Sequence, residues 1–233
     1  MRVLAAVLAI TIALAGVALG CGSSAPEKVA PKRHSGPVPR SLDQTESAAE
    51  DLIDLAFARK RARVVAKARE LRGVAQGAAS ADLRRAGVSE GRLGLFRDQA
   101  KAVATLAPHA PFLRISLGAN QISAFMPEFF ARFSNPVPPQ VLELDYLDRE
   151  AELRGLAGDE PGARGAVRRL SATWSALRRR TIDAGGRRVA TRYSRHVAAM
   201  GRLASRSKGL AFHRKAVSGL ELVDELEGVF RKR

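Results

Sequence analysis

The sequence is poor in cysteine and histidine, and both shortages exclude chemistry. Its single cysteine, Cys21, rules out a disulfide within the chain. None of the four histidines lies three residues after a glutamate, so the Glu-x-x-His pairs of di-iron helical bundles cannot form. With no spare cysteine and no His-x-x-x-His pair, we expect neither a metal site nor a cofactor.

The sequence also lacks convincing period-two alternation, the pattern of a half-buried β-strand. From residue 44 onward, apolar residues instead recur at spacings of three and four, which is typical of amphipathic helices. The body is therefore predicted to be all-α, and a helical bundle is the expected architecture.

An apolar run opens the chain. Arg2 precedes it, and only Thr11 and Gly16 interrupt the stretch from Val3 to Ala18. The run is slightly too short for a confident membrane-spanning helix but suits the apolar region of a signal peptide, which we place at residues 1–20.

The run closes with Val17-Ala18-Leu19-Gly20-Cys21, which resembles the lipobox of bacterial lipoproteins. The resemblance covers only the first two dozen residues. It implies that the Cys21 thiol is diacylated and that Cys21 becomes the new amino terminus after cleavage. Each acyl methylene contributes about 0.8 kcal/mol on burial, so two chains give stable attachment to the membrane.

Residues 21–43 are predicted to form a disordered tether, rich in proline and serine, between the anchor and the body. Four prolines favour extended geometry with a maximum reach of about 60 Å. The expected location is the extracytoplasmic face of the cell membrane, or the outer membrane if the host has two membranes.

Basic residues dominate the charge. The formal net charge is +16, and loss of Arg2 with the leader would leave +15. Export removes nucleic acid as an expected partner, and leaves anionic envelope lipids and polymers as counterparts of a basic surface. Runs such as Arg178-Arg179-Arg180 are more often solvated faces than specific anion sites.

The proline-rich segment Asn135–Pro139 divides the body into two predicted halves, residues 44–134 and 135–233. The first half is expected to hold a helix from near Ser47, broken near Arg59, and further helices from Ser89 and Pro111. The second half is expected to hold four helices, the first spanning residues 139–157, the second opening with Pro161, and the last two following Gly185-Gly186.

The two halves align with each other in order. At an offset of one hundred, Phe112 pairs with Phe212 and Phe130 with Phe230, and nearby offsets pair Phe96 with Tyr193. This alignment predicts a tandem duplication of a helical unit. The alternative is that any two amphipathic helices of this composition can be brought into register.

Two short motifs resemble those of hydrolases, but both lack context. The segment from Gly87 to Gly91 matches G-x-S-x-G, yet no strand precedes it, so Ser89 is better explained as a helix N-cap. Ser205-Arg206-Ser207-Lys208 fits S-x-x-K without the companion motifs of penicillin-binding enzymes. No catalytic residue is assigned.

Four residues are weak candidates for a ligand site. Asp145 and Asp224 lie beside the apolar stripes of their helices, where a carboxylate facing the interior could bind a cation or a basic group. The alternative is that both aspartates form ion pairs with arginines on the protein surface. Pro127 is expected to kink the phenylalanine-rich helix that also contains Asn120, and such a kink can open an apolar pocket. The alternative is that the phenylalanine side chains of this helix simply pack in the core, which is the commoner outcome.

The sequence favours a non-enzymatic, membrane-anchored helical module that binds or scaffolds a protein or an anionic envelope component. The alternative is an extracytoplasmic carrier for a small apolar or cationic ligand held between the helical halves. A hydrolase ranks third.

Overall fold

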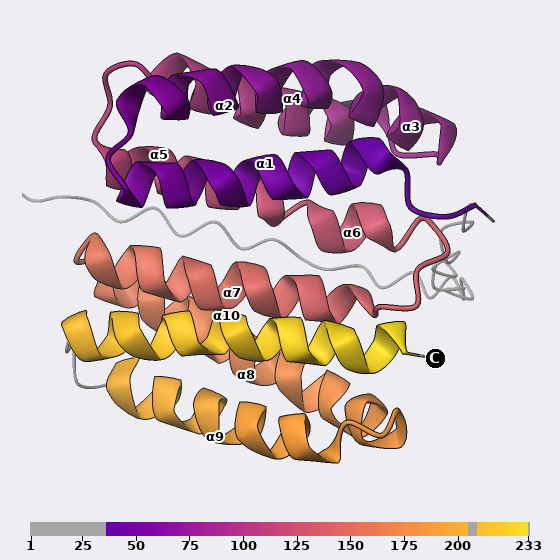
Figure 1. Cartoon of the computed structure of the whole chain (residues 1–233), viewed down its shortest axis with the longest axis vertical. Coiled ribbons are helices and arrows are strands. Elements are labelled where there is room, and N and C mark those ends of the chain that lie inside the picture. The colour runs from indigo at the N-terminus through magenta and orange to yellow at the C-terminus, as the bar shows by residue number, and fades with distance from the viewer. Residues whose placement is uncertain (1–35, 205–208, 233) are drawn as a thin grey trace, which may run out of the picture. The chain divides into compact units, whose positions relative to one another are not determined.

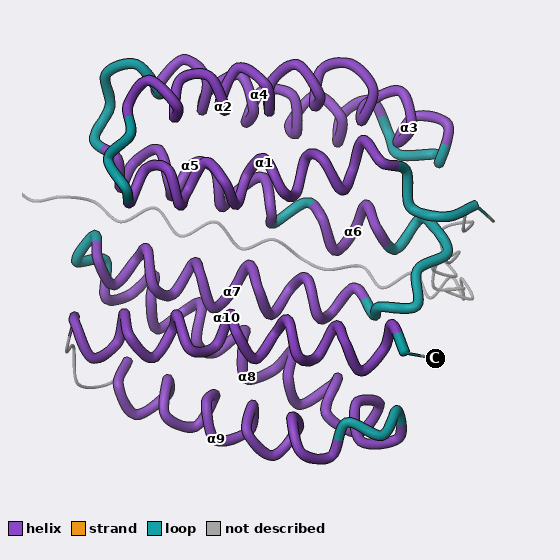
Figure 2. Tube along the Cα trace, in the orientation of Figure 1, coloured by secondary structure: helices purple, strands orange, loops and turns teal. Residues whose placement is uncertain are grey.

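A computed structural model describes residues 36–204 and 209–232 of the chain. The predicted signal peptide, Cys21 and most of the tether lie outside this part. Within it every named element is helical, as Figure 2 shows, and the only extended pairing is an isolated bridge between Pro37 and Ser134. The all-α prediction is confirmed.

Several of the short connections between the helices contain glycine or proline. In chain order the helices are α1 (Arg40–Phe57), α2 (Arg61–Val74), the π-helical turn η1 (Ala75–Ala79), α3 (Ser80–Arg85), α4 (Glu90–Leu106), α5 (Phe112–Ser123), α6 (Met126–Phe130), α7 (Pro139–Leu156), α8 (Glu160–Asp183), α9 (Arg187–Ala204) and α10 (Gly209–Arg231).

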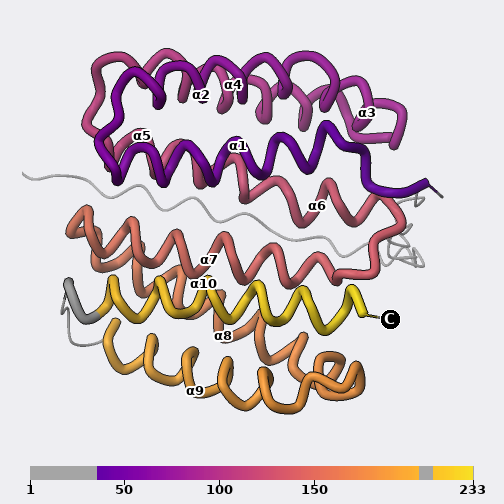
Figure 3. Tube along the Cα trace, viewed as in Figure 1, coloured from indigo at the N-terminus to yellow at the C-terminus, as the bar shows by residue number. Residues whose placement is uncertain are grey.

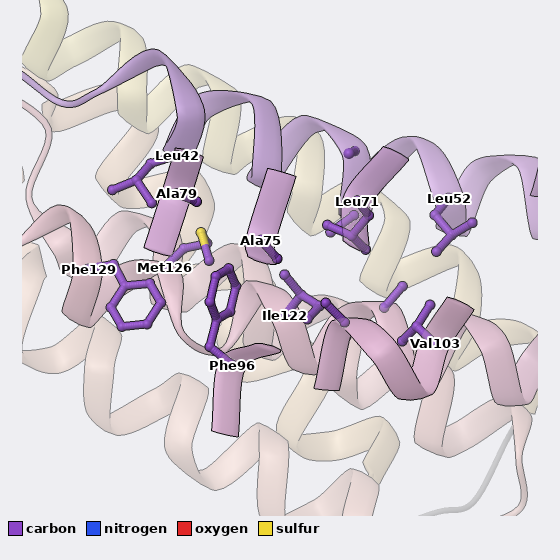
Figure 4. Packing of buried hydrophobic residues seen from close by; sticks show 14 of the residues in the cluster. Leu42, Leu52, Leu71, Ala75, Ala79, Phe96, Val103, Ile122, Met126 and Phe129 are labelled. Carbon is purple, nitrogen blue, oxygen red and sulfur yellow. The ribbon is translucent and has the colours of Figure 1, made fainter. Parts of the chain in front are cut away.

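The first half forms a closed ring of helices. α1 packs against α2 and α5, and α4 packs against α2 and α5. Their apolar faces meet in one core, in which Leu52, Leu71, Phe96 and Ile122 are fully buried (Figure 4). At about 1.5–3 kcal/mol for each large apolar side chain removed from water, this core is the main stabilising contribution of the half.

The second half repeats this arrangement. α7 packs against α8 and α10, and α9 packs against α8 and α10, around a second core containing Leu170, Trp174, Tyr193 and Leu226. Figure 3 shows the same order of packed helices in both halves. This shared topology is what a tandem duplication would leave behind, and the duplication itself remains a prediction.

The halves meet mainly where α5 and α6 pack against α7 (Figure 1). Polar contacts cross this junction: the Nδ2 of Asn120 donates to Glu150 Oε2 at 2.9 Å, and the Nε2 of Gln121 donates to the same oxygen at 3.0 Å. The junction therefore combines apolar packing with hydrogen bonds that fix the register of α5 against α7.

Two boundaries differ from the prediction. α1 begins at Arg40 rather than near Ser47, so the predicted tether can extend no further than Pro39, because Leu42 and Thr45 already belong to the buried face of α1. The phenylalanine-rich helix is two helices, α5 and α6, and Pro127 occupies the first turn of α6, where its missing N–H costs nothing.

Other boundaries fall where the sequence placed them. Arg59, with a φ of 54°, lies in the turn between α1 and α2, which confirms the predicted break. Ser89 is the N-cap of α4, accepting a hydrogen bond from the backbone N–H of Arg92 at 3.3 Å. This capping role accounts for the serine of the G-x-S-x-G match.

Candidate functional site

Charge is sorted by layer in this protein. α8 carries six arginines and two carboxylates, and α9 carries five arginines and no carboxylate. We call this pair of helices the basic layer. In contrast, α1 carries five carboxylates and one arginine, and α7 five carboxylates and two arginines. The positive net charge is therefore unevenly distributed: α1 and α7 form an acidic seam, and α8 and α9 form the basic layer.

Carboxylates from three helices gather on this seam. The acidic cluster, as we define it, consists of Glu46 and Glu50 on α1, Asp145 on α7, and Asp224 and Glu227 on α10. The charges of neighbouring members of the cluster help to raise the pKa values of Glu46, Glu50, Asp145 and Glu227. The structure therefore brings together the predicted candidates Asp145 and Asp224, with Asp145 half-buried and Asp224 exposed.

Burial and mutual repulsion keep the cluster partly protonated. Desolvation, followed by the charges of Glu50 and Asp145, raises the pKa of Glu46 to about 9. Desolvation also raises the pKa of Glu50 to about 7 and that of Asp145 to about 6, and the guanidinium of Arg149 opposes both increases. Near neutral pH such a cluster can share protons or accept a cationic group.

Two arginines oppose the negative charge of the cluster, and Arg149 acts on Glu50 and Asp145. Its side chain is mostly buried, and its Nη1 lies 4.0 Å from Asp54 Oδ1. Its buried Nε has no hydrogen-bond partner among the described residues. A second guanidinium, that of Arg231, lies 2.5 Å from Glu227 Oε2. The five carboxylates of the cluster still outnumber these two cations.

Asn120 and Pro127 do not join this cluster. Asn120 is fully buried at the junction, where it also donates to the carbonyl of Tyr146 at 3.3 Å, so it holds α5 against α7. Near Pro127 the rings of Phe96, Phe125 and Phe129 pack with centroids 5.2–5.7 Å apart. These rings fill the core at the kink.

A second buried polar group was missed from the sequence. In the core of the second half, Asp148 accepts a hydrogen bond from Tyr193 Oη at 2.7 Å, and its other oxygen lies 2.7 Å from His196 Nε2. All three side chains are buried, and burial followed by the charge of Asp148 raises the pKa of Tyr193 well above its ordinary value. The residues are sealed from solvent, so this network is suited to stabilising the core rather than to catalysis.

Gly219 on α10 permits this network. A Cβ atom there would lie 2.5 Å from the His196 ring and 2.6 Å from Asp148 Oδ2. Only glycine lets α10 approach so closely. The only local sign of this network in the sequence is the three-residue spacing of Tyr193 and His196, which places both on one face of a helix. Their partner Asp148 lies more than forty positions earlier in the chain.

The basic layer contains an open groove between α8 and α9. It encloses about 590 Å³, and Trp174, Val167 and Val197 form its apolar floor. Arg164, Arg168 and Arg178 of α8 line its edge. The sequence had treated these arginines as a solvated face, and it gave no sign of a groove because the α9 side of the groove comes from a separate helix.

Among the described residues, no group of three or more histidine, cysteine, aspartate or glutamate side chains is arranged to hold a metal ion. None of the helices in the described ranges has both the length and the apolar character needed to cross a membrane. No protein-family model, curated protein or solved structure gives a significant match to the chain.

Proposed function

We propose that the chain is a bacterial lipoprotein held at the extracytoplasmic face of a membrane by acyl chains on Cys21. Its helical body would act as a non-enzymatic binding or scaffolding module that engages an anionic envelope component through the basic layer. The lipobox-like sequence supports the anchor. The concentration of arginine on α8 and α9 supports the partner, because a positive surface attracts anionic lipids and polymers.

Unpaired arginines are the observation that carries the choice of partner. Arg168, Arg178 and Arg195 have no carboxylate within 4 Å in the part of the chain that the structure describes. Charges already neutralised by an internal ion pair contribute little to binding, whereas these three remain available to a ligand.

The anchor is tested by replacing the cysteine. In a Cys21→Ser variant we expect loss of radiolabelled palmitate incorporation and movement of the protein out of the membrane fraction. A Ser23→Ala variant, altered just beyond the lipobox, should label and fractionate normally. Equal membrane attachment of the Cys21→Ser protein would refute the lipid anchor.

The basic layer is tested with a soluble anionic polymer, polyphosphate, added to the full chain carrying Cys21→Ser. Each guanidinium facing an anionic surface contributes about 1 kcal/mol, so a variant with Arg168→Gln, Arg178→Gln and Arg195→Gln should bind about 100-fold more weakly. Isothermal titration calorimetry at several salt concentrations measures the change.

The matched control removes three exposed arginines from α2, namely Arg63, Arg69 and Arg72, and lowers the net charge by the same amount. It should lose much less affinity. Equal loss in both variants would mean that net charge alone attracts the polymer, and the basic layer would have no special role.

The second candidate function is a carrier for a cationic ligand between the two halves. The acidic cluster favours it, because its five carboxylates outnumber the two guanidinium groups that act on them, those of Arg149 and Arg231. A polycation would relieve the repulsion between these carboxylates.

A further inference from the structure

The groove between α8 and α9 has two kinds of surface. Its floor is apolar, and the side chains that form it are largely packed into the core, with Trp174 only 4% exposed and Val197 only 8% exposed. Its volume of about 590 Å³ falls within the range of roughly 300–1,000 Å³ that is typical of small-molecule pockets. Its edge is cationic.

Three of the polar side chains that line the groove are already hydrogen-bonded within the protein. The Nε1 of Trp174 donates to Ser194 Oγ at 3.0 Å, and the hydroxyl of Ser194 donates to the carbonyl of Ala190 at 2.8 Å. The hydroxyl of Ser175 donates to the carbonyl of Ser171 at 2.8 Å. A sugar or peptide would find few hydrogen-bond partners on this floor, whereas an apolar chain needs none.

The cationic edge is strongest at one end. Arg164 and Arg168 are four residues apart, so they lie on the same face of α8. Arg164 is partly engaged, with Nη1 3.3 Å from Glu160 Oε2, whereas Arg168 has no ion pair among the described residues. Arg178 lies about 15 Å further along the helix, beyond Trp174.

We propose that this groove binds a single-chain anionic amphiphile, with its charged head at Arg168 and Arg164 and its apolar chain along the floor over Trp174. The proposal rests on the proposed function of the basic layer and names the ligand class of that layer. A partner with an anionic head and an apolar tail matches both the charged edge and the apolar floor, whereas a purely ionic polymer matches only the edge.

Trp174 is the sole tryptophan of the chain, so its fluorescence reports the groove directly. We would titrate the full chain carrying Cys21→Ser with octyl, decyl and dodecyl phosphate, each below its critical micelle concentration. Saturable changes in emission are expected. Affinity should rise with chain length, by at most about fourfold for each methylene buried, and inorganic phosphate should cause no saturable change.

Matched variants locate the head and the chain. Arg168→Gln should weaken dodecyl phosphate binding about tenfold, whereas Arg63→Gln, an equal charge loss at an exposed position on α2, should leave it within twofold. Ala198→Phe places a ring in the groove from an exposed position on α9 and should abolish binding. Ala172→Phe, at an exposed position outside the groove, should not. Circular dichroism checks that each variant is folded.

The outcomes separate this inference from the proposed function. If polyphosphate binds but alkyl phosphates show no chain-length dependence, or if Ala198→Phe binds normally, the amphiphile proposal is wrong and the basic layer remains an ionic surface. If neither probe binds, both proposals fail.

Discussion

Replacing Asp148 with alanine should destabilise the protein by about 3–5 kcal/mol. The substitution leaves the Tyr193 hydroxyl and the His196 Nε2 buried without the partner that each now has at 2.7 Å, and it leaves a cavity where the carboxylate was. For a chain of this length, a loss of that size lowers Tm by roughly 6–20 °C. Thermal unfolding followed by circular dichroism at 222 nm measures it.

Two further variants test the explanation. Asp148→Asn keeps the size of the side chain and one acceptor oxygen, so it should lose less stability than Asp148→Ala. Asp98→Ala removes an exposed aspartate with no ion pair among the described residues, and its Tm should match that of the wild type. If Asp148→Ala unfolded at the temperature of the Asp98→Ala control, the buried network would contribute nothing to stability.

The fold was predictable because its boundaries depend on local chemistry. Pro139 opens α7, Gly185 follows the end of α8 with a φ of 88°, and Ser89 caps α4. Each of these signals acts within a few residues. The start of α1 was placed too late because its first turns are polar on the outside. Leu42 and Thr45 extend the buried stripe by two turns, and only their packing against other helices reveals it.

The candidate sites were only partly predictable, because their residues come together through tertiary packing. Asp145 and Asp224 were singled out by their position beside apolar stripes, but nothing local connects them with Glu46, which lies about one hundred residues before Asp145. The network of Asp148, Tyr193 and His196 was missed for the same reason. A sequence shows which face of a helix a carboxylate occupies, and not which other helix that face meets.

Neutralising the acidic cluster should stabilise the protein at high pH. The folded-state pKa values of Glu46 and Glu50, about 9 and about 7, lie above the ordinary glutamate value of 4.5. Between pH 4.5 and pH 9 these two glutamates bind more protons in the folded protein than in the unfolded chain. Their contribution to stability is therefore fully present below about pH 4.5 and is lost as the pH rises toward 9. A Glu46→Gln and Glu50→Gln double variant removes this loss.

We expect the wild type to melt several degrees lower at pH 8.5 than at pH 5.5, and the double variant to melt above the wild type at pH 8.5 by an amount equivalent to at least about 1 kcal/mol. An Asp98→Asn and Glu221→Gln variant removes two exposed carboxylates outside the cluster and should keep the wild-type pH dependence. Identical pH profiles for all three proteins would show that the cluster does not destabilise the fold.

The same variants decide whether the cluster can hold a cation. A carrier predicts that spermine raises the Tm of the wild type at pH 8.5, where the carboxylates are most ionised, and has little effect at pH 5.5, because ligand binding to the folded state adds stability in proportion to ln(1 + [L]/Kd). The double variant and an Asp145→Asn and Asp224→Asn variant should both respond less, since each removes two of the five carboxylates that would face the polycation. An equal response in all the proteins would place spermine elsewhere on the surface and leave the cluster as a source of repulsion between α1, α7 and α10.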